Sequence, residues 1–112
     1  MSDDPVERLH ALRVDVERRL GSLRDDENAL LRDRADATAD DEHDPEGSTL
    51  SGEWSRVDAL RRGAQAERED ILEALARVEL GTYGVCISCG RPIAPGRLEA
   101  RPTAARCVAC AV

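Results

Sequence analysis

Apolar residues recur along the first part of the chain at the spacing of an amphipathic helix. Successive members lie three, four or seven positions apart, which places them on one stripe of a helix. The segment also begins like a helix, because Asp4 can cap it, Pro5 suits the first helical position and Glu7 completes a capping-box spacing. The stripe comprises Val6, Leu9, Leu12, Val16, Leu20, Leu23 and Leu30. The pattern predicts a long first helix.

A second apolar stripe follows, and after its first member the positions alternate in steps of three and four, as in a heptad repeat. Candidate caps stand at Ser48, Thr49 and Ser51, and Gly81 suits the position after a helix end. The stripe comprises Trp54, Val57, Leu60, Ala64, Glu67, Ile71, Ala74 and Val78, with Leu75 beside it. Its one charged member, Glu67, is expected to reach solvent or to help set the register. A second long helix is predicted.

The segment between the two stripes breaks the helical pattern. Residues 40–48 read DDEHDPEGS, with five acidic residues, no Arg, and a Pro and a Gly that disfavour helix. Two amphipathic helices joined by one short turn fold back on each other and bury both stripes. We therefore predict a mainly α fold, with an antiparallel two-helix coiled-coil hairpin over residues 1–80 and an acidic tip near residues 40–48. A plain two-helix bundle that dimerises is the alternative.

Composition and charge narrow the function. The chain has 112 residues, 2% aromatic residues and no Phe, so a large globular core is hard to build. The formal net charge is −7, and contact with phosphates needs clustered positive charge, so direct specific DNA binding is not expected. No apolar run approaches the ~20 residues of a membrane span, and the acidic start is unlike a signal peptide. A soluble cytoplasmic protein with no membrane contact is expected.

The four cysteines form two C-x-x-C pairs, Cys86 with Cys89 and Cys107 with Cys110, separated by seventeen residues. This spacing is typical of a structural zinc site. Each pair can place two thiolates on one side of a tight turn, and two such turns complete a tetrahedral site. Four cysteine ligands leave zinc no open position for water. The sequence therefore predicts one structural Zn²⁺, held by four cysteines in a C-terminal zinc ribbon, residues 81–112.

Other chemistries of the cysteines remain as alternatives. Two disulfides are possible in principle, but a reducing cytosol disfavours them. A redox C-x-x-C needs a βαβ context that the chain lacks, and an iron–sulfur cluster fits the ribbon spacing less well than zinc. His10 and His43 lie far from the cysteines in sequence and are expected to be solvated helix or loop residues.

From Gly81 to Cys110 the sequence resembles the DksA/TraR family of bacterial transcription regulators, which have a C4-type zinc finger. The segment GTYGVCISCGRPI is similar to the first knuckle of the family, and RLEARPTAARCVAC is similar to its second. The string from Arg97 to Pro102, RLEARP, is particularly characteristic. The helical arms agree with the family in length and placement, as a pattern only.

The resemblance implies a mechanism. Members of this family bind RNA polymerase and not DNA, and their hairpin enters the secondary channel, through which nucleotides reach the active site. The acidic tip then lies near the catalytic magnesium and shifts the stability of promoter complexes, often together with the alarmone ppGpp. A stiff rod supplies reach, and an acidic tip suits a basic cavity that contains metal. By this resemblance, Asp41, Asp44 and Glu46 are the candidate tip residues for partner binding.

The tip departs from the Asp-x-x-Asp-x-Ala pattern of the best-known members. Asp44 fits the first Asp, but Gly47 stands at the second and Thr49 at the Ala. A reading shifted to Asp41 keeps both Asp residues and loses the Ala. The longer members also continue into a C-terminal helix that frames a ppGpp pocket near the arginines matched by Arg97 and Arg101, whereas this sequence stops at Val112. Binding of ppGpp is therefore doubtful.

Two other classes of function compete with a polymerase-binding regulator. The first is a zinc-stabilised coiled-coil adaptor that docks on another cytoplasmic protein. The second is transcript cleavage like that of the Gre factors, which also place an acidic hairpin in the channel but have another globular domain and no zinc ribbon. No catalytic triad, phosphate-binding glycine loop or open metal site stands in the sequence, so we do not expect an enzyme.

Overall fold

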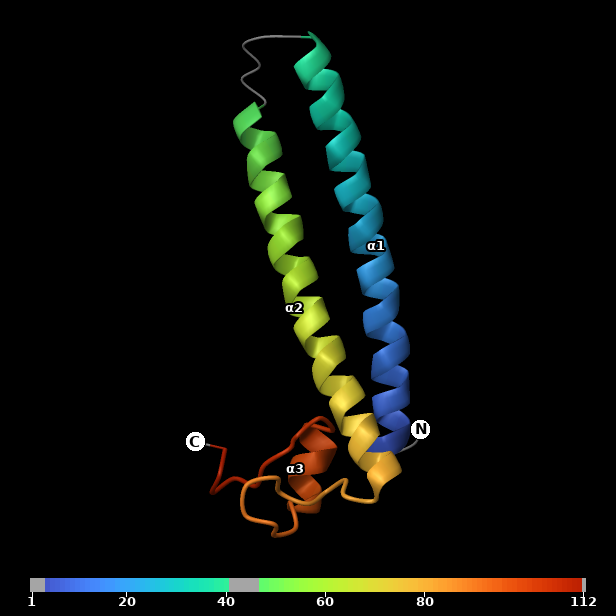
Figure 1. Cartoon of the computed structure of the whole chain (residues 1–112), viewed down its shortest axis with the longest axis vertical. Coiled ribbons are helices and arrows are strands. Elements are labelled where there is room, and N and C mark those ends of the chain that lie inside the picture. Colours follow the sequence, from blue (N-terminus) through green and yellow to red (C-terminus); the bar gives the residue numbers. More distant parts are fainter. Residues whose placement is uncertain (1–3, 41–46, 112) are drawn as a thin grey trace. The chain divides into compact units, whose positions relative to one another are not determined.

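The structure is a computed structural model that describes residues 4–40 and 47–111. In these residues the chain forms three helices, α1 (Pro5–Asp40), α2 (Gly47–Leu80) and α3 (Pro95–Ala100). The chain divides into two compact units, one of Met1–Asp15 with Glu67–Val112 and one of Val16–Ala66. Within each unit, the segments of α1 and α2 lie side by side in opposite directions (Figure 1). The predicted mainly α fold, with two packed long helices before a four-cysteine cluster, is confirmed.

The start of α1 follows the predicted capping. The side-chain oxygen Oδ1 of Asp4 accepts a hydrogen bond of 3.1 Å from the backbone N–H of Val6. The Asp4 carbonyl accepts the first helical bond, from the N–H of Arg8, at 3.0 Å. Pro5 takes the first helical position, where its missing N–H costs nothing, and Glu7 supplies a negative charge to the first turn. These residues fix where the helix begins.

The end of α2 is a Schellman motif. The N–H of Gly81 bonds to the carbonyl of Val78 at 3.1 Å, and the N–H of Thr82 bonds to the carbonyl of Arg77 at 2.9 Å. Gly81 has φ of 75°, a left-handed conformation that a side chain would disfavour. The sequence prediction of a helix end at this glycine is confirmed. The turn releases the chain from the helix directly into the cysteine-containing segment.

The predicted stripes supply the buried residues of both helices. In the first unit Leu9, Ile71 and Ala74 are buried, and in the second unit Val16, Leu30, Val57 and Ala64 are buried. Each of these residues belongs to one of the two predicted stripes. Burial of such aliphatic side chains stabilises the pairing by roughly 25 cal/mol for each Å² of apolar surface removed from water.

One stripe position was predicted wrongly. Leu60 is 49% exposed, whereas the side chain of the next residue, Arg61, is only 28% exposed. Arg61 follows buried Val57 by four residues and precedes buried Ala64 by three, so it shares their face of α2 and its guanidinium can pair with Glu27 of α1, while Leu60 points toward solvent. A stripe assigned from apolar residues alone cannot find a position that a charge pair occupies.

The predicted tip residues Asp41, Asp44 and Glu46 lie outside the described residues, as does His43. The helix bounds fit the predicted break, because α1 ends at Asp40 and α2 begins at Gly47, one residue before the first predicted cap. In the residues that the structure describes, no helix has both the length and the apolar character needed to cross a membrane.

Candidate metal centre

The first cysteine pair lies in a tight turn that its own backbone holds closed. The N–H of Cys86 donates to the carbonyl of Arg91 at 2.8 Å, and the N–H of Gly90 donates to the carbonyl of Cys86 at 2.9 Å. Gly90 has φ of 75°, so the turn needs a residue without a Cβ at this point. The turn directs Cys86 and Cys89 to one side, as the C-x-x-C spacing predicts. We call this turn the first knuckle, residues 86–91.

The second cysteine pair forms a matching turn, which we call the second knuckle, residues 107–111. The carbonyl of Cys107 accepts hydrogen bonds of 3.0 Å from the N–H groups of both Cys110 and Ala111. The segment that leads into it comes from the short helix α3. Among the described residues, β-type pairing is limited to one isolated antiparallel bridge, between Val85 and Pro92.

Polar bonds also join the first knuckle and α3 to Ala105 and Arg106, the two residues directly before the second knuckle. The N–H of Ile87 donates to the carbonyl of Ala105 at 2.9 Å. The Nε of Arg106 donates to the hydroxyl of Ser88 at 3.0 Å, and the carbonyl of Arg106 accepts a bond of 2.8 Å from Nε of Arg97. Protein groups outside the cluster therefore help to hold the two cysteine pairs face to face.

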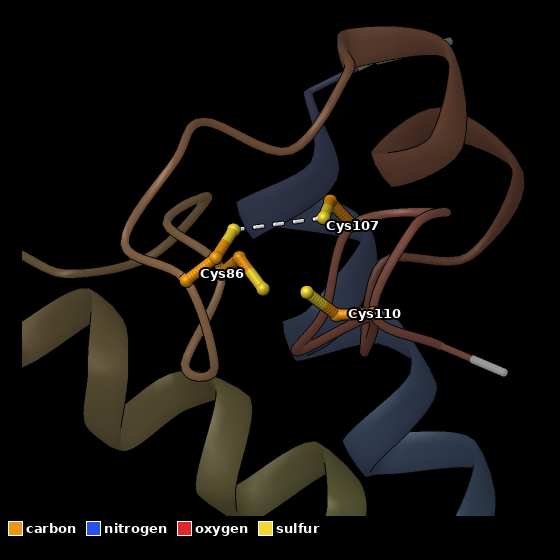
Figure 2. A group of neighbouring side chains, drawn as sticks. Cys86, Cys107 and Cys110 are labelled. Carbon is orange, nitrogen blue, oxygen red and sulfur yellow. Dashed lines mark hydrogen bonds between the residues drawn. The ribbon is translucent and has the colours of Figure 1, made fainter.

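The four thiols converge on one point, as Figure 2 shows for Cys86, Cys107 and Cys110. All four sulfur atoms, with that of Cys89, lie within 4.8 Å of one another. The Sγ atoms of Cys89 and Cys107 are 3.7 Å apart. A tetrahedral zinc ion with Zn–S bonds of ~2.3 Å sets its sulfur ligands about 3.8 Å apart. The cluster therefore fits zinc with little adjustment.

The thiols affect one another's ionisation. Hydrogen bonding at the backbone of Cys107 is the main cause that lowers the pKa of Cys86 to about 6. Hydrogen bonding with the Cys107 side chain is the main cause that raises the pKa of Cys110 to about 12. Four thiolates this close together repel one another, so the cluster needs a cation before all four can lose their protons.

The donor set is complete without other residues. Cys86 is 2% exposed, and the three other cysteines are more accessible, so a metal can reach the site from solvent. Within the described residues, the four cysteines are the one group of potential ligands that lie close enough together to hold a metal ion. His10 is an exposed residue of α1 and does not join them. A site of four cysteine ligands has no open position for substrate, so its zinc is structural.

A positively charged cavity of about 520 Å³ lies beside the second knuckle. Arg97, Arg101 and Arg106 line it, with Asp70 of α2 and Cys110 also on its wall. The family resemblance places Arg97 and Arg101 near a pocket, whereas no sequence pattern indicated Arg106 or Asp70. The sequence feature that could have indicated Arg106 is its position directly before Cys107, a predicted zinc ligand.

Comparison with known proteins places this segment in a family. Residues 81–112 match the family model of the prokaryotic DksA/TraR C4-type zinc finger. By this match, residues 81–112 are similar to the zinc finger of the DksA/TraR family. Over 32 residues it is 62% identical to the RNA polymerase-binding transcription factor DksA of Caulobacter vibrioides, in both strain NA1000 and strain ATCC 19089. The aligned segment is 29% of this chain and 22% of the length of each of these DksA proteins. A DksA/TraR finger of the C4 type carries one structural zinc ion.

The fold is shared over a longer stretch than the finger. The structure of the transcription factor DksA2 from Pseudomonas aeruginosa superposes with a TM-score of 0.79 and 24% sequence identity. The match covers 94% of this chain and 75% of the DksA2 chain. At this identity the likeness concerns the fold alone. It extends the agreement with a DksA/TraR protein from the finger to the paired helices.

Proposed function

We propose that this protein regulates transcription by binding RNA polymerase, with its hairpin in the secondary channel of the enzyme. The observation that carries the proposal is the 62% identity of its finger to proteins described as RNA polymerase-binding transcription factors. The similarity to DksA2 supports it further, because that fold presents two long paired helices beyond the finger. On this proposal the protein works in the cytoplasm, where bacterial RNA polymerase lies.

We assign the zinc ligands to Cys86, Cys89, Cys107 and Cys110, which we propose as one four-cysteine site. The 3.7 Å between two of the sulfur atoms and the convergence of all four support this assignment. When bound, zinc supplies a fixed positive centre that ties the two knuckles together. The domain boundary that we propose, between the hairpin of residues 1–80 and the finger of residues 81–112, coincides with the glycine turn after α2.

The proposed regulator acts by occupying a channel and not by chemistry of its own. Its candidate partner-binding residues are Asp41, Asp44 and Glu46. Modulation of initiation would then come from negative charge placed near the catalytic magnesium of the polymerase. Direct DNA contact is not part of the proposal, because the net charge of −7 repels phosphates.

The proposal includes weak binding of ppGpp at most. The cavity beside the second knuckle has three arginines, a charge that suits phosphates, but Asp70 stands on the same wall. We expect ppGpp to bind the isolated protein weakly. Isothermal titration of ppGpp into the zinc-loaded protein, compared with an Arg101→Gln variant, measures this expectation.

The experiment that tests the proposal is a binding titration with purified bacterial RNA polymerase. Zinc-loaded protein with a fluorescent label on its N-terminus is titrated with core enzyme, and a Gre-type factor is then added as a competitor for the channel. We expect saturable binding that the competitor displaces, and a changed lifetime of open promoter complexes.

The outcomes separate the competing functions. Binding that a channel competitor does not displace would reject the channel and keep a polymerase partner. No binding to core enzyme or holoenzyme would reject the proposal and favour the adaptor, which a pull-down from the native cytoplasm would then identify. Cleavage of a backtracked transcript by the purified protein would favour the Gre-like alternative.

A further inference from the structure

A short irregular segment links α3 to the second knuckle. We call residues 99–106 the connector, which runs from the end of α3 to the residue before Cys107. Apart from its first two residues it has no regular secondary structure. Pro102 and Ala104 are nevertheless buried, so this backbone is partly removed from water. Buried carbonyl groups need hydrogen-bond donors, and an irregular segment lacks the repeating backbone hydrogen bonds by which a helix or sheet supplies them.

The donors come from two sides of the connector. The bonds from outside it are Arg8 Nη1 to the Glu99 carbonyl, Tyr83 Oη to the Pro102 carbonyl at 2.8 Å, Arg77 Nη2 to the Thr103 carbonyl at 3.4 Å, Ile87 N to the Ala105 carbonyl at 2.9 Å, and Arg97 Nε to the Arg106 carbonyl at 2.8 Å. Three of the five donors belong to the helical arms or to the turn that follows them. The other two belong to the first knuckle and to α3.

Tyr83 donates the shorter of the two measured helix-side bonds, 2.8 Å against 3.4 Å for Arg77. Its ring is half-buried, and burial is the main cause that raises the pKa of its hydroxyl. The charges of Arg77, Asp4 and Arg8 also act on that pKa. Arg8 comes from α1 and Arg77 from α2, so the connector is bonded to both helices of the first unit.

The other end of the connector leads into the metal centre. Arg106 directly precedes Cys107, and its Nε donates to Ser88 between the cysteines of the first knuckle. A zinc ion bound to Cys107 therefore fixes the end of the connector, while Tyr83, Arg77 and Arg8 fix its beginning and middle.

We propose that the connector couples zinc binding to the pairing of α1 and α2 at the base of the hairpin, with Tyr83 as the principal link. Arg8 and Arg77 are the supporting links, and the 3.4 Å bond of Arg77 is the weakest of the measured ones. Zinc orders the connector, and an ordered connector holds its carbonyls where the three side chains can bond to them. Loss of zinc releases these bonds and loosens residues 5–15 and 67–80.

The coupling is reciprocal by thermodynamic necessity. If bound zinc multiplies the equilibrium constant for pairing of α1 and α2 at the hairpin base by some factor, this pairing multiplies the zinc-binding constant by the same factor. A net hydrogen-bond contribution of the usual size corresponds to roughly a fivefold change in an equilibrium constant. This inference does not depend on any polymerase, so it stands or fails separately from the proposed function.

The first test measures zinc affinity by competition with a chromogenic chelator in the full chain. Tyr83→Phe keeps the ring and removes the donor to Pro102, so we expect zinc affinity to fall by roughly fivefold. Arg8→Gln should lower it in the same direction. Arg62→Met is the matched control, because Arg62 is 75% exposed and pairs with Asp58 within α2, in the other unit. Its zinc affinity should equal that of the wild type.

The second test measures amide hydrogen exchange with and without a chelator. We expect zinc removal to speed exchange in residues 82–111, and also in 5–15 and 67–80, while 16–36 and 54–66 change little. In Tyr83→Phe, zinc should protect 5–15 and 67–80 less than it does in the wild type. Wild-type zinc affinity in both Tyr83→Phe and Arg8→Gln would overturn the proposal, as would exchange changes confined to residues 82–111.

Discussion

Arg61 of α2 and Glu27 of α1 form an ion pair between the two long helices, with Nε 2.9 Å from Oε1. Arg61 Nη2 also lies 2.7 Å from Asp58 Oδ1, and Nη1 bonds to Gln65 at 3.2 Å. The hydrogen bond with Asp58 is the main cause that raises the pKa of Arg61, followed in the same direction by Glu27. Arg61 therefore bonds to one residue of α1, Glu27, and to two residues of its own helix α2, Asp58 and Gln65.

This ion pair gives a prediction about hairpin stability. Glu27→Gln removes the charge and roughly keeps the shape, so the melting temperature should fall by a few degrees at low salt. The decrease should shrink at high salt, because an incompletely buried pair is screened. Circular dichroism at two salt concentrations measures this, with Glu53→Gln as a control that removes an exposed charge from α2. Equal decreases in the two variants would show that the pair contributes nothing specific.

The metal centre gives a second prediction. Zinc-loaded protein should contain one Zn²⁺ per chain, and Cys89→Ser should lose it. Residues 82–111 should then unfold while the hairpin keeps most of its helicity, because zinc supplies much of the folding free energy of such small domains. Ala109→Ser is the control, since it adds a hydroxyl to the second knuckle and keeps all four thiols. Elemental analysis that finds no zinc in wild-type protein purified without chelators would contradict the assignment.

Tyr83 gives a pH prediction. Its pKa is higher in the folded protein than the usual value near 10, because burial favours the neutral hydroxyl. The folded state therefore holds this proton more tightly than the unfolded state does. The resulting stability is fully present below about pH 10 and is lost as pH rises through the folded pKa. The ionised oxygen also cannot donate to Pro102.

Urea unfolding from neutral to strongly alkaline pH measures this effect. The wild type should be more stable than Tyr83→Phe at neutral pH, and the difference should shrink above about pH 10. The phenylalanine variant serves as its own control, because it lacks the titrating group and reports every other alkaline change. A difference that stays constant across this range would show that Tyr83 does not ionise with unfolding.

The sequence predicted those features that follow from periodicity and spacing. Burial of Leu9, Val16 and Ile71 follows from an apolar stripe, and convergence of the thiols follows from two C-x-x-C pairs. It did not predict the roles of Arg61 and Tyr83. Both depend on partners far away in sequence, Glu27 and Pro102, and no local pattern marks such a pair.

The charge of the protein predicts its behaviour toward DNA. With a net charge of −7 it should not shift a promoter fragment in a gel assay when polymerase is absent, even at low salt. When polymerase is added, the promoter fragment should shift only as part of a complex that contains polymerase. A shift by the purified protein alone, at concentrations that leave random DNA unshifted, would disprove the prediction.

The last prediction concerns the proposed tip and separates a regulator from an adaptor. Changing Asp41 and Asp44 to Asn and Glu46 to Gln removes three negative charges and roughly keeps side-chain shape. If the tip acts near the catalytic magnesium, promoter-complex lifetime should lose most of its response to the protein. Affinity for the polymerase should change little, because the remaining helical surface and the finger would supply most of the contact.

A matched variant keeps this test specific. Asp25→Asn, Asp26→Asn and Glu53→Gln change the net charge equally at exposed positions of the paired helices. If negative charge steers the hairpin toward a basic channel in general, both triple variants should slow association alike. If the tip has its own role, only the tip variant should lose its effect on promoter complexes while both still bind. A tip variant that alters transcription as strongly as the wild type would reject the role of the acidic tip and leave only docking.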